Sequence, residues 1–121
     1  MKITDRKKKT RLIVKNGHQN IVLTVSDVAM IYIKERSVFV VAHDSKKYQF
    51  SKSLTDIEQE LDADLFFRAN RHTIVNINFI KAFTACECNK LKVDMKIHVP
   101  DTEIIISQET APLFKTWLSE S

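Results

Sequence analysis

The chain has 121 residues, 44% of them hydrophobic and 28% charged, which suits one globular domain and excludes disordered and collagen-like classes. One glycine and two prolines argue against flexible linkers, and no apolar run reaches the ~20 residues that span a bilayer. The basic N-terminus lacks the apolar stretch of a signal peptide, so we expect a cytoplasmic protein.

The net charge of +4 comes from the N-terminal end of the chain. Residues 1–11 hold six basic groups and one acid, whereas residues 12–121 hold thirteen basic and fourteen acidic groups. The overall charge therefore says little about the folded part. We expect a basic arm or linker stub over residues 1–10 and one domain over residues 11–121.

Strands are predicted for the first half of the domain, because its apolar runs are rich in Val, Ile, Tyr and Phe and show no helical period. Asn16-Gly17 separates the first two runs, and Asn-Gly is the strongest short-range hairpin signal. The spacer of four residues predicts a hairpin with a slightly long loop. The predicted strands are residues 11–15, 20–25, 29–35, 37–44 and 47–51.

A change of period predicts one amphipathic helix over residues 54–62. Its apolar side chains recur at helical spacing, at Leu54, Ile57 and Leu61. Ser53 precedes the helix, and Asp56 stands three residues later in a carboxylate variant of the capping box. Because the apolar stripe is narrow, we expect this helix to pack on a sheet rather than inside a bundle.

Residues 66–80, FFRANRHTIVNINFI, place hydrogen-bonding side chains inside a strand-like apolar segment. The polar group comprises Arg68, Asn70, Arg71 and His72. An arginine matches the two acceptors of guanine, and an asparagine can pair in the same way with adenine. The alternative is that Arg68 covers Phe66 and that Asn70 caps a turn.

The remaining segments complete a mainly antiparallel β-protein. Further strands are predicted at residues 81–87, 90–95 and 102–107, with turns at Asn89 and Pro100-Asp101. The apolar spacing near the C-terminus predicts a short helix that docks its aromatic side chains on a sheet. Basic residues gather in segments 34–52 and 66–81, and five acids lie in 56–64. If these segments lie apart in space, the resulting basic face favours a polyanionic partner.

The sequence carries no pattern typical of an enzyme, a metal site or a cofactor site. Cys86 and Cys88 lie two apart on a predicted strand, and His98 is a weak third ligand, so two reduced thiols are favoured over zinc. A single glycine excludes a phosphate-cradling loop, and no histidine accompanies a nucleophile elbow. We therefore expect a protein that is not an enzyme and binds no metal or cofactor.

The motif Phe67-Arg68-x-x-Arg71, followed by Ile74-Val75-Asn76 and Ile80, resembles the signature of the LytTR family of bacterial DNA-binding domains. That signature reads F-x-R-x-H-R-S-x-x-V-N with an isoleucine four residues on. Further similarity covers residues 28–33, 54–61 and 105–107, so that roughly residues 11–118 take part. The resemblance implies an elongated, mainly β arrangement of small, mostly antiparallel sheets, with one packed helix and a short C-terminal helix.

The resemblance also implies a transcriptional regulator that reads major-groove base edges with loop residues. Arg71 matches the family's central contact residue. Asn70 stands where histidine is usual, His72 where serine or threonine is usual, and Gln108 where a second arginine is usual, followed by Glu109. The implied DNA-binding residues are Arg71, Asn70, His72, Arg68, Arg36, Ser37 and Gln108.

The implied partner is double-stranded promoter DNA, bound by paired copies on repeated half-sites. Many domains of this family follow a receiver or sensor domain, so the chain is either a stand-alone regulator resembling a response regulator or an excised domain. No membrane partner is expected. The alternative function is a small β-domain that meets an acidic protein through its basic face, without specific DNA readout.

Overall fold

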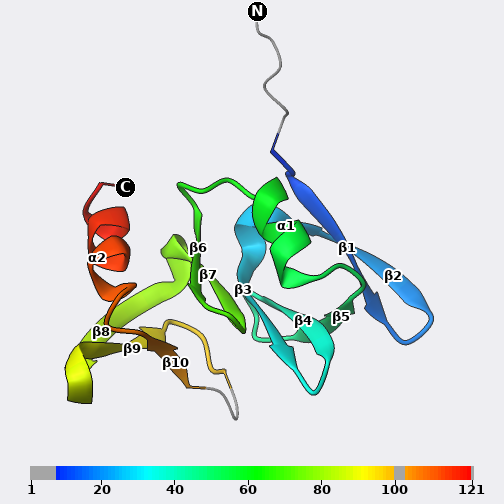
Figure 1. Cartoon of the computed structure of the whole chain (residues 1–121). Helices are drawn as coiled ribbons and strands as arrows, with labels where there is room; N and C mark the ends of the chain where they lie inside the picture. Colours follow the sequence, from blue (N-terminus) through cyan, green and yellow to red (C-terminus); the bar gives the residue numbers. More distant parts are fainter. Residues whose placement is uncertain (1–7, 100–102, 121) are drawn as a thin grey trace, which may run out of the picture.

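The computed structural model describes residues 8–99 and 103–120, and these form two antiparallel sheets and two α-helices (Figure 1). The larger sheet has the strand order β2-β1-β5-β4-β3-β7-β6, and the smaller has the order β10-β9-β8. The larger sheet contains β1 (Arg11–Asn16), β2 (Gln19–Thr24), β3 (Val28–Lys34), β4 (Ser37–Ala42), β5 (Lys47–Phe50), β6 (Phe66–Asn70) and β7 (Thr73–Asn76). The smaller contains β8 (Ile80–Cys86), β9 (Lys90–Met95) and β10 (Ile104–Ile106), and the helices are α1 (Leu54–Glu60) and α2 (Ala111–Ser119).

The predicted mainly β fold with one packed helix and a C-terminal helix is confirmed. Most predicted strands differ from the observed ones by one or two residues at their ends. Residues 66–80 are a hairpin, with β6 and β7 paired antiparallel, followed by a short turn. The proposed Pro100-Asp101 turn lies outside the described residues. Within the described part of the chain, neither helix is long and apolar enough to cross a membrane.

The first hairpin is tighter than its sequence predicts. Strand β1 ends at Asn16 and β2 begins at Gln19, so the loop has two residues and not four. Gly17 adopts φ +62°, a conformation that glycine reaches without the steric cost of a side chain. The polar residues at both ends of the loop join the ladder, with Asn16 opposite Gln19, and this pairing extends the strands beyond their apolar runs.

One hydrophobic core lies under α1. Leu54, Ile57 and Leu61 are almost fully buried against side chains of the larger sheet. The Ser53 hydroxyl accepts a hydrogen bond from the backbone N–H of Asp56 at 3.1 Å, which satisfies one of the free donors of the first turn. The helix therefore packs on a sheet, as its narrow apolar stripe predicts.

A second core lies under α2, at the opposite end of the molecule from the first hairpin (Figure 1). Phe114 is fully buried, and its ring centroid lies 5.4 Å from that of Phe67 in β6 and 5.5 Å from that of Phe83 in β8. The indole N–H of Trp117 donates to the Ala63 carbonyl at 2.8 Å. The C-terminal helix thus joins the smaller sheet to the edge of the larger one.

The acidic and basic segments contact one another, contrary to the separated faces that the sequence suggests. Glu60 of α1 lies 2.9 Å from the ammonium group of Lys52 and 3.6 Å from that of Lys9. Glu58 lies 2.8 Å from the guanidinium of Arg68. The acids of α1 therefore neutralise part of the basic charge around them, because the helix packs directly beside the strands that carry it.

Replacing Lys52 with glutamine is expected to destabilise the fold at pH 7 but less so in acid. The hydrogen bond from Lys52 lowers the pKa of Glu60 below its ordinary value of 4.5. A carboxyl group with a lowered pKa in the folded state contributes stability above the unfolded pKa and loses that contribution as the pH falls through the folded pKa. Urea midpoints of the original chain and Lys52→Gln should therefore converge as the pH falls from 7 through the folded pKa of Glu60.

Lys46→Gln is the matched control for this measurement, since Lys46 is exposed and its side chain has no described partner. Its midpoint should follow that of the original chain at every pH. A Lys52→Gln difference that stays constant down to the acid limit would contradict the assigned Glu60 contact.

Candidate nucleic-acid interface

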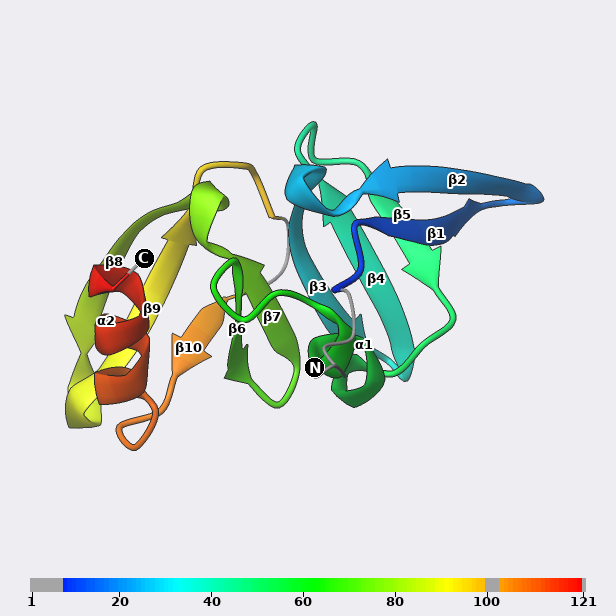
Figure 2. The same ribbon diagram turned by 90° about the horizontal axis from the view of Figure 1, so that it is seen from above.

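Three turns lie on the same side of the elongated molecule (Figure 2). They are the β3–β4 turn, the β6–β7 turn and the connection from β10 to α2. Strands β3 and β7 pair antiparallel, and the backbone N–H of Ile33 donates to the His72 carbonyl at 2.9 Å. This register places the first two turns at the same end of the paired strands of the larger sheet.

The β3–β4 turn has a fixed and unusual backbone. Glu35 and Arg36 both adopt left-handed conformations, with φ of 52° and 68°. Two consecutive residues of this kind form the tight turn that matches the twist of a β-hairpin. Lys34 and Ser37 pair directly on either side. Arg36 is therefore exposed on a short, rigid turn, and Ser37 is half-buried at its base.

Arg68 holds the β6–β7 turn from within the protein. Its Nε donates to the Asn70 carbonyl and one terminal nitrogen donates to the Arg71 carbonyl, both at 2.9 Å. The other terminal nitrogen donates to a Glu58 carboxylate oxygen at 2.8 Å. The guanidinium fork is thus occupied by intramolecular partners.

Asn70 also has both of its polar atoms engaged. Its Oδ1 accepts from the backbone N–H of His72 at 2.8 Å, which caps the turn. Its Nδ2 donates to the Ile105 carbonyl at 2.9 Å and so joins the larger sheet to β10. Arg71 and His72 between these anchors are exposed, and their side chains have no hydrogen bond or ion pair among the described residues.

Gln108 lies in the turn that leads from β10 into α2. Ser107 organises this turn, because its carbonyl accepts from the backbone N–H groups of Thr110 and Ala111 at 3.1 and 2.9 Å. Gln108 and Glu109 are exposed on it, so an amide and a carboxylate occupy this part of the surface. The β10–β6 contact through Asn70 relates this turn to the β6–β7 turn.

A hollow of about 270 Å³ lies next to the β6–β7 turn. Its polar lining includes Lys34, Asn70, His72 and Glu103. Glu103 is missing from the predicted site, and no feature near it in the sequence relates it to the Arg71 segment. Only the placement of β10 beside β6 brings this carboxylate to the hollow, and one of its oxygens lies 3.6 Å from the ammonium group of Lys92.

The side with the three turns is polar. The large hydrophobic side chains that are exposed in the described residues are Ile13, Val22, Phe83 and Leu113. None of them belongs to the three turns. An apolar docking patch on this side would have favoured the protein-interaction alternative. The surface instead presents hydrogen-bonding groups on short turns, an arrangement that suits contact with base edges and phosphates.

The cysteine arrangement differs from the prediction. Strand β8 ends at Cys86, and Cys88 lies in a tight turn with φ 61° rather than on the strand. The two thiols therefore do not share a strand face, because the turn changes the chain direction between them. Both are free and exposed, and no cluster of three metal-binding side chains occurs among the residues with described positions.

Removing the Arg68 side chain is expected to loosen the β6–β7 turn. Arg68→Ala deletes three charged hydrogen bonds in a partly exposed setting, so the free energy of unfolding should fall by about 1–3 kcal/mol. Urea denaturation measures the loss, and faster amide exchange at residues 70–73 localises it. Lys81→Ala is the control, because Lys81 is exposed without a described partner. Unchanged exchange in the turn would contradict the role assigned to Arg68.

Comparison with known proteins identifies the fold and its family. A model of the LytTr DNA-binding domain matches residues 18–119. A solved structure of the LytTr DNA-binding domain of a putative methyl-accepting/DNA response regulator from Bacillus cereus is similar, with a TM-score of 0.78 and 26% sequence identity. The match covers 91% of this chain and 97% of that chain. No curated protein matches. The chain belongs to the LytTR family of DNA-binding domains.

Proposed function

We propose that this chain is a sequence-specific DNA-binding transcriptional regulator, or the DNA-binding domain of one, and that it reads major-groove base edges with residues of the three turns. The observation that carries this proposal is the setting of Arg71. Its guanidinium is exposed and unpaired among the described residues, while the backbone on either side is held by Arg68 and Asn70. The backbone that carries this donor is therefore already ordered, so binding does not have to order the turn as well.

The predicted contact residues divide into two groups by their partners. Arg71, His72, Arg36 and Gln108 are exposed and are the proposed DNA contacts. Arginine suits guanine O6 and N7, and glutamine suits adenine N6 and N7. Ser37, half-buried at the base of its turn, suits a phosphate. Arg68 and Asn70 are proposed to position the turn, because their polar atoms already bond within the protein.

Two acids modify this interface. Glu109 follows Gln108 on the third turn, and Glu103 lines the hollow beside His72. Carboxylates repel phosphates but accept hydrogen bonds from cytosine N4. The proposed site therefore differs in base preference from one that carries two arginines, and its affinity for unselected DNA is lower.

The proposed assembly is a pair of copies on repeated half-sites of promoter DNA. A domain of this size presents three turns on one side, which limits the number of bases that one copy contacts. A receiver or sensor domain is proposed as the source of the input signal. The relative from Bacillus cereus is named as part of a DNA response regulator, which supports this part of the proposal.

Selection from a random pool of duplex DNA tests the proposed function. The chain should enrich a motif that occurs twice at a constant spacing, and affinity for the selected duplex should fall steeply as salt rises. An unselected duplex of equal length is the control for non-specific binding. Binding without enrichment would assign the affinity to backbone contacts alone. Absence of binding even at low salt would overturn the proposal and favour a protein partner for the basic surface.

A further inference from the structure

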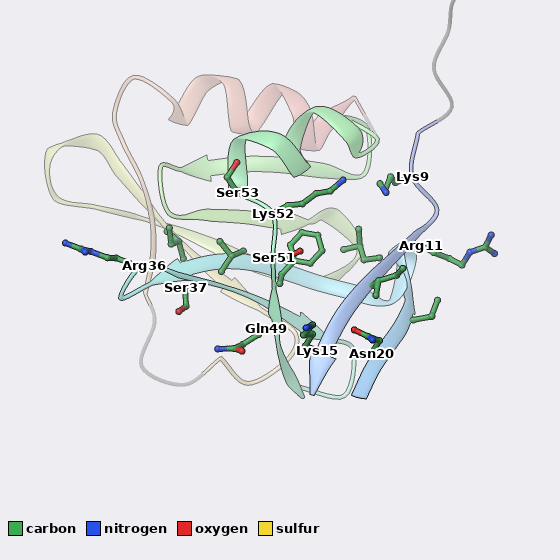
Figure 3. A pocket seen from close by; sticks show the side chains of 16 residues that line it. Lys9, Arg11, Lys15, Asn20, Arg36, Ser37, Gln49, Ser51, Lys52 and Ser53 are labelled. Atoms are coloured by element: carbon green, nitrogen blue, oxygen red, sulfur yellow. The ribbon is translucent and has the colours of Figure 1, made fainter. Parts of the chain in front are cut away.

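A groove opens between the first hairpin and β5, away from the β6–β7 turn (Figure 3). Strands β1 and β5 pair at one position, Lys15 opposite Gln49, and then diverge. The groove encloses about 1030 Å³. In Figure 3, Arg36 and Ser37 lie at one end, Lys9 and Arg11 at the other, and Lys15 between them.

The charged side chains that line this groove are all basic. They are Lys9, Arg11, Lys15, Arg36 and Lys52. Lys9 and Lys52 contact Glu60 and are therefore partly neutralised. The other three have no described hydrogen bond or ion pair within the protein. A ligand in this groove thus meets uncompensated positive charge along its length.

The same groove has an apolar wall that is open to water. Ile13 and Val22 are directly paired across β1 and β2, and their side chains are 63% and 62% exposed. Phe50, Ile33 and Val38 also line the groove. Exposed apolar side chains that are adjacent and rimmed by polar groups are typical of binding surfaces.

Strand β2 is the free edge of the larger sheet. Its sequence, QNIVLT, contains neither a charge nor a proline, the devices that usually protect an edge from pairing with another chain. The hairpin therefore combines an unprotected edge, an apolar pair and flanking cations. An extended peptide can use all three, since its backbone pairs with the edge and every second side chain lies on the face that carries Arg11, Ile13, Lys15 and Val22.

We propose that this hairpin and its groove bind an extended acidic segment of a partner protein, whose carboxylates lie beside Arg11 and Lys15 and whose aliphatic side chains cover Ile13 and Val22. The charge of the groove selects an acidic occupant. Its apolar wall selects a protein segment over DNA, because a phosphate backbone leaves Ile13 and Val22 wet. A second copy that paired through its own β2 would not neutralise the cations of the groove, because β2 carries no carboxylate.

Binding of synthetic peptides to the whole chain tests this proposal. The probe is a fluorescein-labelled peptide ESVSESV, which as a strand places Glu and Val on one face, and its binding is followed by fluorescence anisotropy. Two comparison peptides test the charge and the aliphatic groups separately, since KSVSKSV reverses the charge and ESSSESS removes the aliphatic groups. We expect ESVSESV to bind about tenfold more tightly than either comparison peptide. Amide signals that shift on titration should map to residues 11–22 and 49–53.

Two double variants assign the contacts. Arg11→Glu with Lys15→Glu should weaken ESVSESV binding by about fivefold or more, and Ile13→Ser with Val22→Ser should reduce it to the level of ESSSESS. All four side chains are exposed, so the amide spectrum should remain that of the folded protein. Lys81→Glu with Lys115→Glu, on β8 and α2, is the matched control because it changes the net charge by the same amount outside the groove. Arg36 stays unchanged in these variants because it belongs to the proposed DNA interface.

Three results would overturn the proposal. Equal binding of ESVSESV and KSVSKSV would exclude charge selection. Shifts of the hairpin amides by duplex DNA, without binding of ESVSESV, would make the groove a path for phosphates. A dimer that dissociates in the Ile13→Ser, Val22→Ser variant would make a second copy the occupant. DNA binding is measured separately, so failure of the proposed function would leave this test interpretable.

Discussion

Arg71→Ala is expected to lose the enrichment of a specific DNA motif while the protein remains folded. An arginine that contacts a guanine through two hydrogen bonds contributes about 1–3 kcal/mol of discrimination, so affinity for the selected duplex should fall by about 10- to 100-fold. The side chain is exposed and has no partner among the described residues, so the urea midpoint should hardly change. Anisotropy on selected and unselected duplexes measures both specific and non-specific binding.

Arg71→Lys separates base readout from simple charge. Lysine keeps the positive charge but lacks the planar fork, so binding to unselected DNA should persist while discrimination falls. Lys115→Ala is the control for loss of a surface cation on α2, away from the three turns. If Arg71→Ala enriches the same motif with the same affinity, Arg71 does not read bases. The reading residues would then have to be sought at Arg36 and Gln108.

Phe114→Ala is expected to cause a large loss of stability. Truncating a fully buried phenylalanine removes apolar burial and leaves a cavity, at a cost of about 3–5 kcal/mol. The ring contacts with Phe67 and Phe83 tie α2 to both sheets. Urea denaturation of Phe114→Ala should therefore show a much lower midpoint. Its effect should extend to the Gln108 turn, because that turn leads directly into the helix.

Leu113→Ala is the matched control, one residue earlier on the same helix. Leu113 is 64% exposed, so its truncation should change the free energy of unfolding by no more than about 0.5 kcal/mol. Similar losses for both variants would mean that α2 is stabilised by its own helical structure rather than by burial of Phe114. Amide exchange along residues 107–119 would show which elements separate from the sheet first.

The fold was largely predictable because its signals are local. Apolar runs rich in β-branched and aromatic residues predict strands, and helical spacing after Ser53 predicts α1 with its capping hydroxyl. Errors occur where the determining contact is not local. The β1–β2 loop is shorter than expected because polar residues at its ends joined the ladder. The left-handed backbone of Glu35 and Arg36 is not indicated by the sequence, because the β3–β4 turn contains no glycine or asparagine.

In the candidate site too, features that depend on local sequence were predictable, and features that depend on distant contacts were not. The sequence, with its family motif, singled out Arg71 and the short segments that the three turns present. It could not separate the exposed Arg71 from Arg68, whose side chain bonds within the protein, because the two residues are chemically identical. Their difference depends on neighbours distant in the chain, namely Glu58 ten residues away and, for Asn70, Ile105 thirty-five residues away.

By itself, then, the amino-acid sequence determined the class of fold, the positions of the helices and the polar segment between Phe67 and Asn76. Those properties depend on periodicity and on residue chemistry within a few positions. Only the tertiary structure decided which cations are free and where unprotected apolar side chains remain. Lys52 and Arg68 form ion pairs with carboxylates of α1, so these two cations are not free. Val22 is open to solvent because β2 lies at the free edge of the sheet. Both outcomes depend on which segments pack side by side, which residue spacing does not specify.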